Sequence, residues 1–230
     1  MTTAMADSSS PASVVTSLYL RTKSLHAEAE RSGIIRDLLR GDASREGYVL
    51  LLRNLLPAYR AMEQGLESHR GSSILGKLAS YRLDRAAAIE ADLSAICGER
   101  WSEQIPLLAA ACLYATRVAK AAEDDGTRLI AHAYTRYLGD LSGGQILQRL
   151  LAGSLELGPS ELSFYDFPRF PDLNALKSEY RQAIDQAGSR AADRHAVVEE
   201  AAMAFSLNID LSRAVQSAVS EELAGTAAAD

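Results

Sequence analysis

The sequence predicts an all-α fold, on three observations. Apolar residues recur at spacings of three and four along most of the 230-residue chain, as they do on the buried face of a helix. Clean alternation of apolar and polar residues between hairpin turns, which would indicate strands, does not occur. The hydrophobic content of 47% is sufficient for one large core. We therefore expect a single multi-helix domain over residues 13–223, between disordered tails at 1–12 and 224–230.

The first three expected helices occupy residues 14–31, 34–40 and 44–69. Gly41 directly follows the second helix, and Pro57 lies inside the third. Since proline removes a backbone hydrogen bond and clashes with the preceding turn, we expect the third helix to bend at Pro57.

The remaining helices are expected at 82–96, 106–122, 126–152, 173–188 and 191–223. Pro106 is placed in the first turn of its helix, where the missing backbone N–H has no intrahelical partner to lose. A loop rich in proline and aromatic residues, 158–172, precedes the last two helices. No linker and no internal repeat interrupts this series, which favours one domain.

Charge and cysteine content restrict the function classes. The chain has 24 Lys and Arg against 30 Asp and Glu, and its net charge of −6 argues against a surface that grips nucleic acid or anionic lipid. Cys97 and Cys112 lack CxxC spacing, so neither a disulfide framework nor a thiolate zinc site is indicated, and a reducing cytoplasm is the simplest expectation. Residues 1–13 do not resemble a signal peptide, and the longest apolar run, 105–115, is shorter than the roughly 18 residues of a spanning helix. We expect no membrane anchor.

The common catalytic signatures are missing. None of the histidines, which are His26, His69, His132 and His195, has a glutamate three residues before it, and this excludes the Glu-x-x-His pairs of carboxylate-bridged di-iron bundles. HExxH, GxGxxG, the P-loop and GxSxG are also absent from the sequence. The usual zinc, nucleotide and serine-hydrolase sites are therefore not indicated.

His26 is the histidine with the most suggestive neighbour. Glu30 follows four residues later on the same helix face, where its carboxylate can accept a hydrogen bond from one imidazole nitrogen and orient the other toward a metal. A partly exposed ion pair explains the same spacing, and this feature taken alone favours that simpler interpretation.

The segment YLGDLSGGQIL, residues 137–147, places three glycines inside an expected helix. Each costs about 0.5–1 kcal/mol relative to alanine, so another interaction must offset the loss. Gly139 and Gly143 share one helix face and form a groove that admits either a flat ligand or the backbone of a neighbouring helix. Close helix packing leaves Asp140, a charged residue beside the groove, unexplained.

These segments carry a resemblance to the haem oxygenases. The stretch YTRYLGDLSGGQIL, residues 134–147, resembles the signature of that family, LHAEAE at 25–30 resembles its proximal-histidine segment, and AFSLNIDL at 204–211 resembles its C-terminal helix. The resemblance extends from about residue 13 to residue 223. It implies a helical bundle with haem between a proximal helix and a kinked distal helix.

The resemblance implies a role for each residue near the ring. His26 would be the axial iron ligand, with Glu30 as its hydrogen-bonding partner. Gly139 and Gly143 would contact the porphyrin face, and Gly144 would relax the kink.

The resemblance also implies a polar network on the distal side of the ring. Asp140 would be the distal carboxylate, which acts through ordered water. Tyr59 and Arg136 match positions that support this network, and Asn208 is a further candidate.

The two haem propionates need cationic or hydroxyl partners. Lys177 and Arg181 stand one turn apart and match the family's propionate-binding pair, and Tyr134 matches its hydroxyl partner. A solvated basic helix face is the alternative interpretation of the two cations. Tyr19 occupies a position that is often basic in the family, so the contacts at that end are expected to differ.

The function implied is a haem-degrading monooxygenase. Haem b would be both cofactor and substrate, O2 the oxidant, and the products biliverdin, opened at the α-meso carbon, carbon monoxide and ferrous iron. Electrons would come from an external donor such as a ferredoxin or a flavoprotein reductase. Its candidate docking residues are Arg117, Lys120, Arg149, Lys177 and Arg181.

Two other functions stay open at this point. A haem carrier or sensor on the same fold would bind haem without turnover, and a helical interaction module would not bind haem at all. The retention of Asp140 beside the glycine pair favours the enzyme over the carrier.

Overall fold

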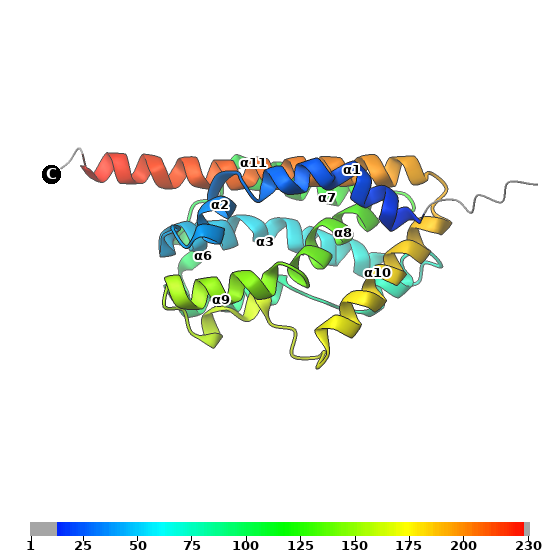
Figure 1. Ribbon diagram of the computed structural model, residues 1–230, viewed down its shortest axis with the longest axis horizontal. Coiled ribbons are helices and arrows are strands. Elements are labelled where there is room, and N and C mark those ends of the chain that lie inside the picture. Colours follow the sequence, from blue (N-terminus) through cyan, green and yellow to red (C-terminus); the bar gives the residue numbers. More distant parts are fainter. Residues whose placement is uncertain (1–12, 228–230) are drawn as a thin grey trace, which may run out of the picture.

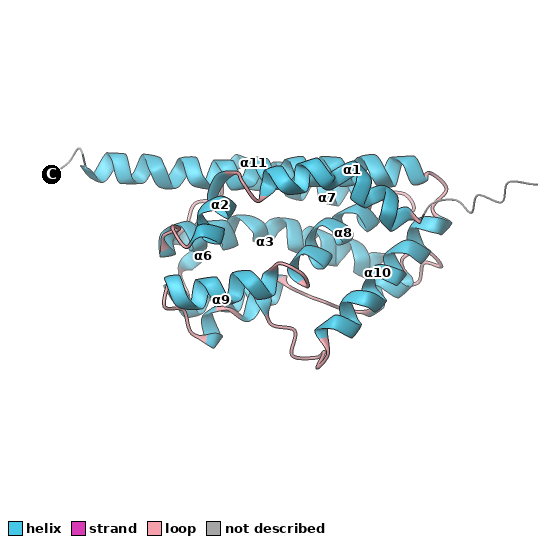
Figure 2. Cartoon of the chain, viewed as in Figure 1, coloured by secondary structure: helices cyan, strands magenta, loops and turns pink. Residues whose placement is uncertain are grey.

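The computed structural model describes residues 13–227, with side chains as far as Glu221. Within these residues the chain is built of helices and loops and contains no strand (Figure 2), which confirms the all-α prediction. The helices are α1 (Val14–Ala29), α2 (Gly33–Arg40), α3 (Arg45–Ser68), α4 (Gly76–Ser80), α5 (Ala86–Cys97), α6 (Trp101–Gln104), α7 (Ala109–Ala121), α8 (Leu129–Asp140), α9 (Gly144–Ser154), the 3-10 helices η1 (Pro159–Glu161) and η2 (Ser163–Tyr165), α10 (Leu173–Arg190) and α11 (Arg194–Ala227). None of the helices in this part of the chain is long and apolar enough to cross a bilayer.

The long helix α11 runs along one edge of the molecule, with α1 packed against it (Figure 1). Helix α7 packs against both α11 and α3, and α8 packs against both α11 and α10. Helix α9 follows α8 after a short turn and lies on the opposite side of the molecule from α11. The α1–α11 pair therefore faces the α8–α9 segment.

Side-chain caps explain where several helices begin. The Ser44 side chain accepts a hydrogen bond from the N–H of Gly47 at the start of α3, and Asp172 accepts from two N–H groups at the start of α10. Helix α2 ends at Gly41, whose φ of 77° lies in the left-handed region that glycine adopts without strain. Pro57 lies inside α3, as expected.

Helix ends differ from the expectations by a few residues, and two short helices were not expected. With five and four residues, α4 and α6 are too short to show a period of 3.6. The expected tail at 1–12 lies outside the described residues, as do residues 228–230. Residues 224–227 continue α11, so the helix extends beyond the expected boundary at 223.

The placement of Pro106 in the first turn of a helix is wrong, because α7 begins at Ala109. The buried Asn54 on α3 determines the geometry before α7: its amide nitrogen donates to the carbonyl of Pro106 at 3.2 Å, and its oxygen accepts from the N–H of Leu108 at 2.7 Å. These bonds satisfy backbone groups in a non-helical arrangement.

The single helix expected at 126–152 is also wrong, because α8 ends at Asp140 and α9 begins at Gly144. In the turn between them, the N–H groups of Ser142 and Gly143 both donate to the carbonyl of Gly139, at 3.1 and 2.8 Å. The kink implied by the resemblance is thus a complete break between two helices. Gly143 has φ −81° and ψ −24°, a conformation open to any residue, so backbone geometry does not require glycine there.

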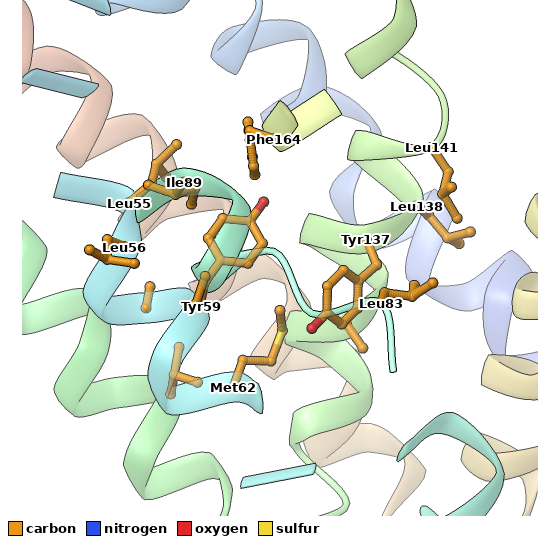
Figure 3. Close-up of a cluster of buried hydrophobic side chains, with 14 of the residues drawn as sticks. Leu55, Leu56, Tyr59, Met62, Leu83, Ile89, Tyr137, Leu138, Leu141 and Phe164 are labelled. Atoms are coloured by element: carbon orange, nitrogen blue, oxygen red, sulfur yellow. The ribbon is translucent and has the colours of Figure 1, made fainter. Parts of the chain in front are cut away.

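The core lies between α3, α8 and the loop that carries η2. Leu56, Tyr59 and Met62 on α3 are at most 1% exposed. Figure 3 shows Tyr59 between Phe164 and the α8 residue Tyr137. The ring of Tyr59 meets that of Phe164 edge-on, at a centroid distance of 5.4 Å and an angle of 80°. This packing fixes the Tyr59 ring beneath the functional cavity described next.

Candidate functional site

A cavity of about 620 Å³ lies between α1 and the α8–α9 turn. Helix α1 contributes Lys23 and His26, and the α8–α9 segment contributes Gly139, Asp140 and Gly143. Further walls come from α2, α3, α10, α11 and η2, mostly through apolar side chains. Segments distant in the sequence therefore meet around one space.

Gly139 and Gly143 keep one wall of this cavity free of side chains. Among the described residues, no atom lies within 4 Å of the place where a Cβ on Gly139 would stand, and only the Gly139 carbonyl oxygen lies that close to the corresponding place at Gly143, at 3.7 Å. A side chain at either position would project into empty space in the cavity. Of the two interpretations left open by the sequence, close packing of a neighbouring helix against these glycines is not observed in the described part of the chain, and the open wall, which we call the glycine cradle, has room for a flat ligand.

Position 144 is a glycine for a different structural reason. A Cβ added there would stand 3.1 Å from Cδ1 of Tyr165, which is tighter than about nine in ten natural contacts of this kind. Glycine therefore favours the close packing of α9 against η2, and the expected role of Gly144 in relaxing the kink stays a prediction.

His26 lies on the α1 wall of the cavity. Its Nδ1 atom is 3.6 Å from Oε1 of Glu30, a distance at which the groups attract without forming a direct hydrogen bond. The imidazole ring packs against Phe205 of α11, with the centroids 5.8 Å apart. Since Nδ1 faces Glu30, the Nε2 atom is the nitrogen available to a metal.

Asp140 is buried at the centre of a hydrogen-bonded network. The Tyr59 hydroxyl donates to its Oδ2 atom at 2.6 Å, and Nη2 of Arg136 lies 3.5 Å from Oδ1. Arg136 also donates from Nε to the Tyr59 hydroxyl at 2.9 Å and from Nη1 to Oδ1 of Asn208 at 2.7 Å. The structure therefore brings together all four residues that the sequence placed in a distal network.

Burial is the main electrostatic influence on this network. It raises the pKa of Asp140, an effect opposed by the positive charge of Arg136 and the hydrogen bond from Tyr59. It also raises the pKa of Tyr59 well above its usual value, so this hydroxyl keeps its proton and acts as a donor. Asp140 is thus a carboxylate whose proton affinity is increased and adjusted by two named neighbours.

The cavity lining includes cationic and hydroxyl side chains. These are Lys23, Tyr134, Arg181 and Tyr19, which is 52% exposed. Of the two cations expected at the propionates, Arg181 lines the cavity and Lys177 does not. Binding of the propionates by Arg181 and Tyr134 stays a prediction.

Several cavity residues were missed by the sequence analysis. Phe164 and Tyr165 come from the 3-10 helix η2 inside the loop 158–172, where no periodic pattern marks a buried face. The only available signal was the density of aromatic residues in that loop. Phe205, which packs against His26, lies within the matched segment 204–211 but was not assigned a role.

A second buried polar cluster lies outside the cavity lining. Glu200 on α11 accepts a hydrogen bond from Nε of Arg117 at 2.8 Å, and its Oε1 atom is 3.0 Å from Nε2 of His132. Although burial opposes it, the bonds from His132 and Arg117 lower the pKa of Glu200 to about 2. His132 shares a helix with Gly139 but points to α11, so its function is to join α8 to α11.

The residues present fit haem. The cavity is mostly apolar, its glycine wall admits a flat ring, an imidazole lies on a different wall, and cationic side chains are among the lining residues. These features match a planar apolar ligand that carries a metal and two carboxylates.

Comparisons with known proteins agree with this geometry. The family described as Heme oxygenase matches residues 12–214. Heme oxygenase 1 from Nostoc sp. is 36% identical over 195 residues, which cover 84% of this chain and 82% of that protein. Heme oxygenase 1 from Homo sapiens is 36% identical over 211 residues, which cover 90% of this chain and 73% of that protein.

Two solved structures show the same architecture. The crystal structure of heme oxygenase-1 from the cyanobacterium Synechocystis sp. PCC6803 in complex with heme superposes with a TM-score of 0.85 at 31% identity, covering 94% of this chain and 98% of that one. The heme oxygenase from Leptospira interrogans superposes with a TM-score of 0.80 at 32% identity, covering 88% and 99%.

Proposed function

This chain belongs to the haem oxygenase family and is a haem-degrading enzyme, and we propose which of its residues perform the reaction. The reaction opens haem to biliverdin, carbon monoxide and iron. Haem is therefore both the bound cofactor and the substrate. The observation that carries the proposal is the placement of the buried Asp140 carboxylate, held by Tyr59 and Arg136, beside the open glycine wall.

His26 would hold the iron through Nε2. The Glu30 carboxylate, 3.6 Å from Nδ1, favours a proton on that nitrogen and so leaves Nε2 with a free lone pair. Phe205 limits rotation of the imidazole from the α11 side. These two contacts would orient the imidazole ring of His26 toward the iron.

Bound haem supplies the iron that activates O2 and the carbon that is oxidised. The chain supplies the cavity that would hold the ring and the groups that would hold and transfer protons. Because Gly139 and Gly143 carry no side chain, the ring can approach the backbone of the α8–α9 turn. Asp140 would then hold ordered water next to the ring and pass protons through it, since its raised proton affinity suits a group that both accepts and returns a proton.

Arg181 and Tyr134 would bind the haem propionates, with Lys23 as a third partner. Such contacts to the propionates would fix the rotation of haem in its plane. Together with the family resemblance, this supports our proposal that the ring opens at the α-meso carbon.

We also propose that an acidic ferredoxin or a flavoprotein reductase delivers electrons at the exposed cationic rim. Arg181 is the candidate that both lines the cavity and is exposed, whereas Arg117 is bound to the buried Glu200. Because the net charge of −6 repels an acidic donor, docking would depend on local attraction to this cationic rim, and that attraction should weaken as salt rises. The cytoplasmic location stays a prediction.

Reconstitution with hemin, followed by single turnover with ascorbate under air and chromatography of the bilins, tests this assignment. His26→Ala should lose the spectrum of histidine-ligated haem and the turnover, and added imidazole should restore the spectrum. Asp140→Ala should still bind hemin but form no biliverdin. A wild-type protein that binds hemin without forming biliverdin would instead be a carrier, and biliverdin at the wild-type rate from Asp140→Ala would overturn the role of that carboxylate.

A further inference from the structure

Asp92 on α5 is a buried carboxylate that lies outside the cavity lining. Its side chain is fully buried, with 0% of the residue exposed. Burial raises its pKa, and hydrogen bonds from the backbone of Phe164 and Ser163 oppose that rise. A charge in such a place is retained only where specific donors stabilise it.

The donors belong to the backbone of η2. The N–H of Ser163 donates to Oδ1 of Asp92 at 2.7 Å, and the N–H of Phe164 donates to Oδ2 at 2.8 Å. Each carboxylate oxygen therefore accepts a hydrogen bond from one backbone N–H group. An ionised carboxylate is the stronger acceptor for both donors at once, because neither oxygen then carries a proton.

Arg85, in the turn before α5, holds the same segment from its carbonyl side. Its Nη1 atom donates to the carbonyl of Phe164 at 3.1 Å and also to that of Asp166. The guanidinium lies over the ring of Phe167, 4.1 Å from the centroid. Asp92 thus accepts from backbone N–H groups of residues 163–166, and Arg85 donates to backbone carbonyls of the same segment. We call this pair of residues the α5 clamp.

The clamped segment forms the aromatic wall of the cavity. Phe164 meets the ring of Tyr59 edge-on (Figure 3). The Tyr59 hydroxyl in turn donates to Asp140. The next residue, Tyr165, packs at Gly144, and its carbonyl accepts from Nε2 of Gln145 at 2.8 Å. One segment thus contacts both the residue that orients Asp140 and the first turn of α9.

We propose that Asp92 is a positioning residue for haem oxidation, which acts by holding Ser163 and Phe164 so that the aromatic wall fixes Tyr59 and the α8–α9 turn around Asp140. This inference rests on the proposed function of Asp140. Asp92 touches neither the cavity nor the network itself. Its effect passes through two backbone hydrogen bonds and one aromatic contact.

Asp92→Asn is the sharpest test, because it keeps the size of the side chain and removes one acceptor. An amide oxygen can accept from one of the two N–H groups, and the amide nitrogen then faces the other donor. Hydrogen exchange of the hemin-free protein should show faster exchange at Ser163 and Phe164, a readout independent of haem. Hemin affinity should change by less than threefold, as an order-of-magnitude limit, because the glycine wall and His26 are untouched.

Turnover is the second readout. The rate of biliverdin formation should fall about tenfold, since small displacements of orienting groups remote from the chemistry have effects of this size. The share of minor bilin isomers should rise in the same variant. A purely structural residue would lower the melting temperature without changing the rate per bound haem or the isomer ratio.

Glu200→Gln is the matched control. Glu200 is also a buried carboxylate outside the cavity lining, and it accepts from Nε of Arg117 at 2.8 Å and lies 3.0 Å from Nε2 of His132. Neither partner belongs to the α5 clamp or lines the cavity. The variant should lose thermal stability yet keep the wild-type rate within about twofold and the wild-type isomer ratio.

The outcomes are distinguishable. Equal rates and isomer ratios in Asp92→Asn and Glu200→Gln would overturn the proposal, whereas absence of biliverdin from the wild type would overturn the proposed function instead. Should Asp92→Asn not fold, Arg85→Lys loosens the same segment from its carbonyl side and is expected to reproduce the lower rate. A wild-type rate in a folded Arg85→Lys protein would then count against the α5 clamp.

Discussion

The Tyr59 hydroxyl donates to Asp140 and at the same time accepts from Arg136, at 2.6 and 2.9 Å. A guanidinium can only donate, so it occupies an acceptor site of the hydroxyl and directs its single proton to the carboxylate. The direction of this chain of hydrogen bonds is therefore fixed by residue types. Asp140 is held as an acceptor.

This relationship predicts the effect of Tyr59→Phe on the pH profile. The Tyr59 bond lowers the pKa of Asp140, so its loss should raise that pKa further. If the ionised carboxylate is the active form, the acid limb of the rate against pH should move to higher pH. Single-turnover rates across pH 5–8, a range of roughly three units around neutrality, measure the shift.

Tyr180→Phe is the control for that measurement. Tyr180 is also a fully buried tyrosine, and its hydroxyl has no hydrogen-bond partner among the described residues. The acid limb of the rate against pH for Tyr180→Phe should coincide with that of the wild type. An unmoved limb in Tyr59→Phe would show that the hydroxyl does not control Asp140.

Gly139→Ala and Gly153→Ala separate the cost of a helical glycine from its function. Both positions are open to a methyl group among the described residues, so each substitution should stabilise the apo fold by about 0.5–1 kcal/mol. Only Gly139 faces the cavity. Hemin titration should therefore show weaker binding for Gly139→Ala alone, and equal affinity in both variants would contradict the cradle.

Arg181→Ala and Lys177→Ala test the propionate end. Arg181 lines the cavity and Lys177 does not. Removing the Arg181 charge should weaken hemin binding about three- to fivefold, because exposed charge pairs contribute below about 1 kcal/mol. Lys177→Ala should change the hemin dissociation constant little. If Lys177→Ala weakened hemin binding more than Arg181→Ala, Lys177 and not Arg181 would be the propionate partner.

Glu200→Gln tests the cluster that joins α8 to α11. The folded pKa of Glu200 is about 2, below its ordinary value of 4.5, so its ionisation stabilises the fold above pH 4.5, and this stabilisation is lost as the pH falls toward 2. At neutral pH the substitution should cost about 2 kcal/mol, the usual effect of losing bonds to a charged group. Urea unfolding at pH 7 and near pH 3 measures the difference, which should shrink at the lower pH.

Glu199→Gln is the neighbouring control, because Glu199 pairs with Arg21 at the surface. It should alter stability little at either pH. A loss in Glu200→Gln that is the same at both pH values would show that charge is not the cause.

The sequence predicted the helices and the main site residues because both leave local patterns. His26 and Glu30 lie on the single helix α1, so their shared face can be derived from the helical period alone. The glycines at 139, 143 and 144 could be identified as unusual from their density within an expected helix. The break after Asp140 was missed because the periodic pattern continues through the turn. Pairing of Tyr59 with Asp140 rests on tertiary packing, and only the family resemblance suggested it.

Lys177 and Arg181 show that helical spacing alone does not predict which side chains line a cavity. Lys177 and Arg181 are four residues apart, which leaves them rotated by roughly 40° on α10. That rotation is enough for one to line the cavity and the other to stay outside it. The packing angle of α10 against α8 decides between them, and no local pattern encodes that angle.

Both sides of the cavity depend on α11, the last helix among the described residues. Phe205 packs against the imidazole of His26, and Asn208 accepts from Arg136. A growing polypeptide on the ribosome therefore has the other helices of the site before it has these two supports. His26 and Asp140 can reach the arrangement described here only after α11 has been synthesised and has packed against α1 and α8.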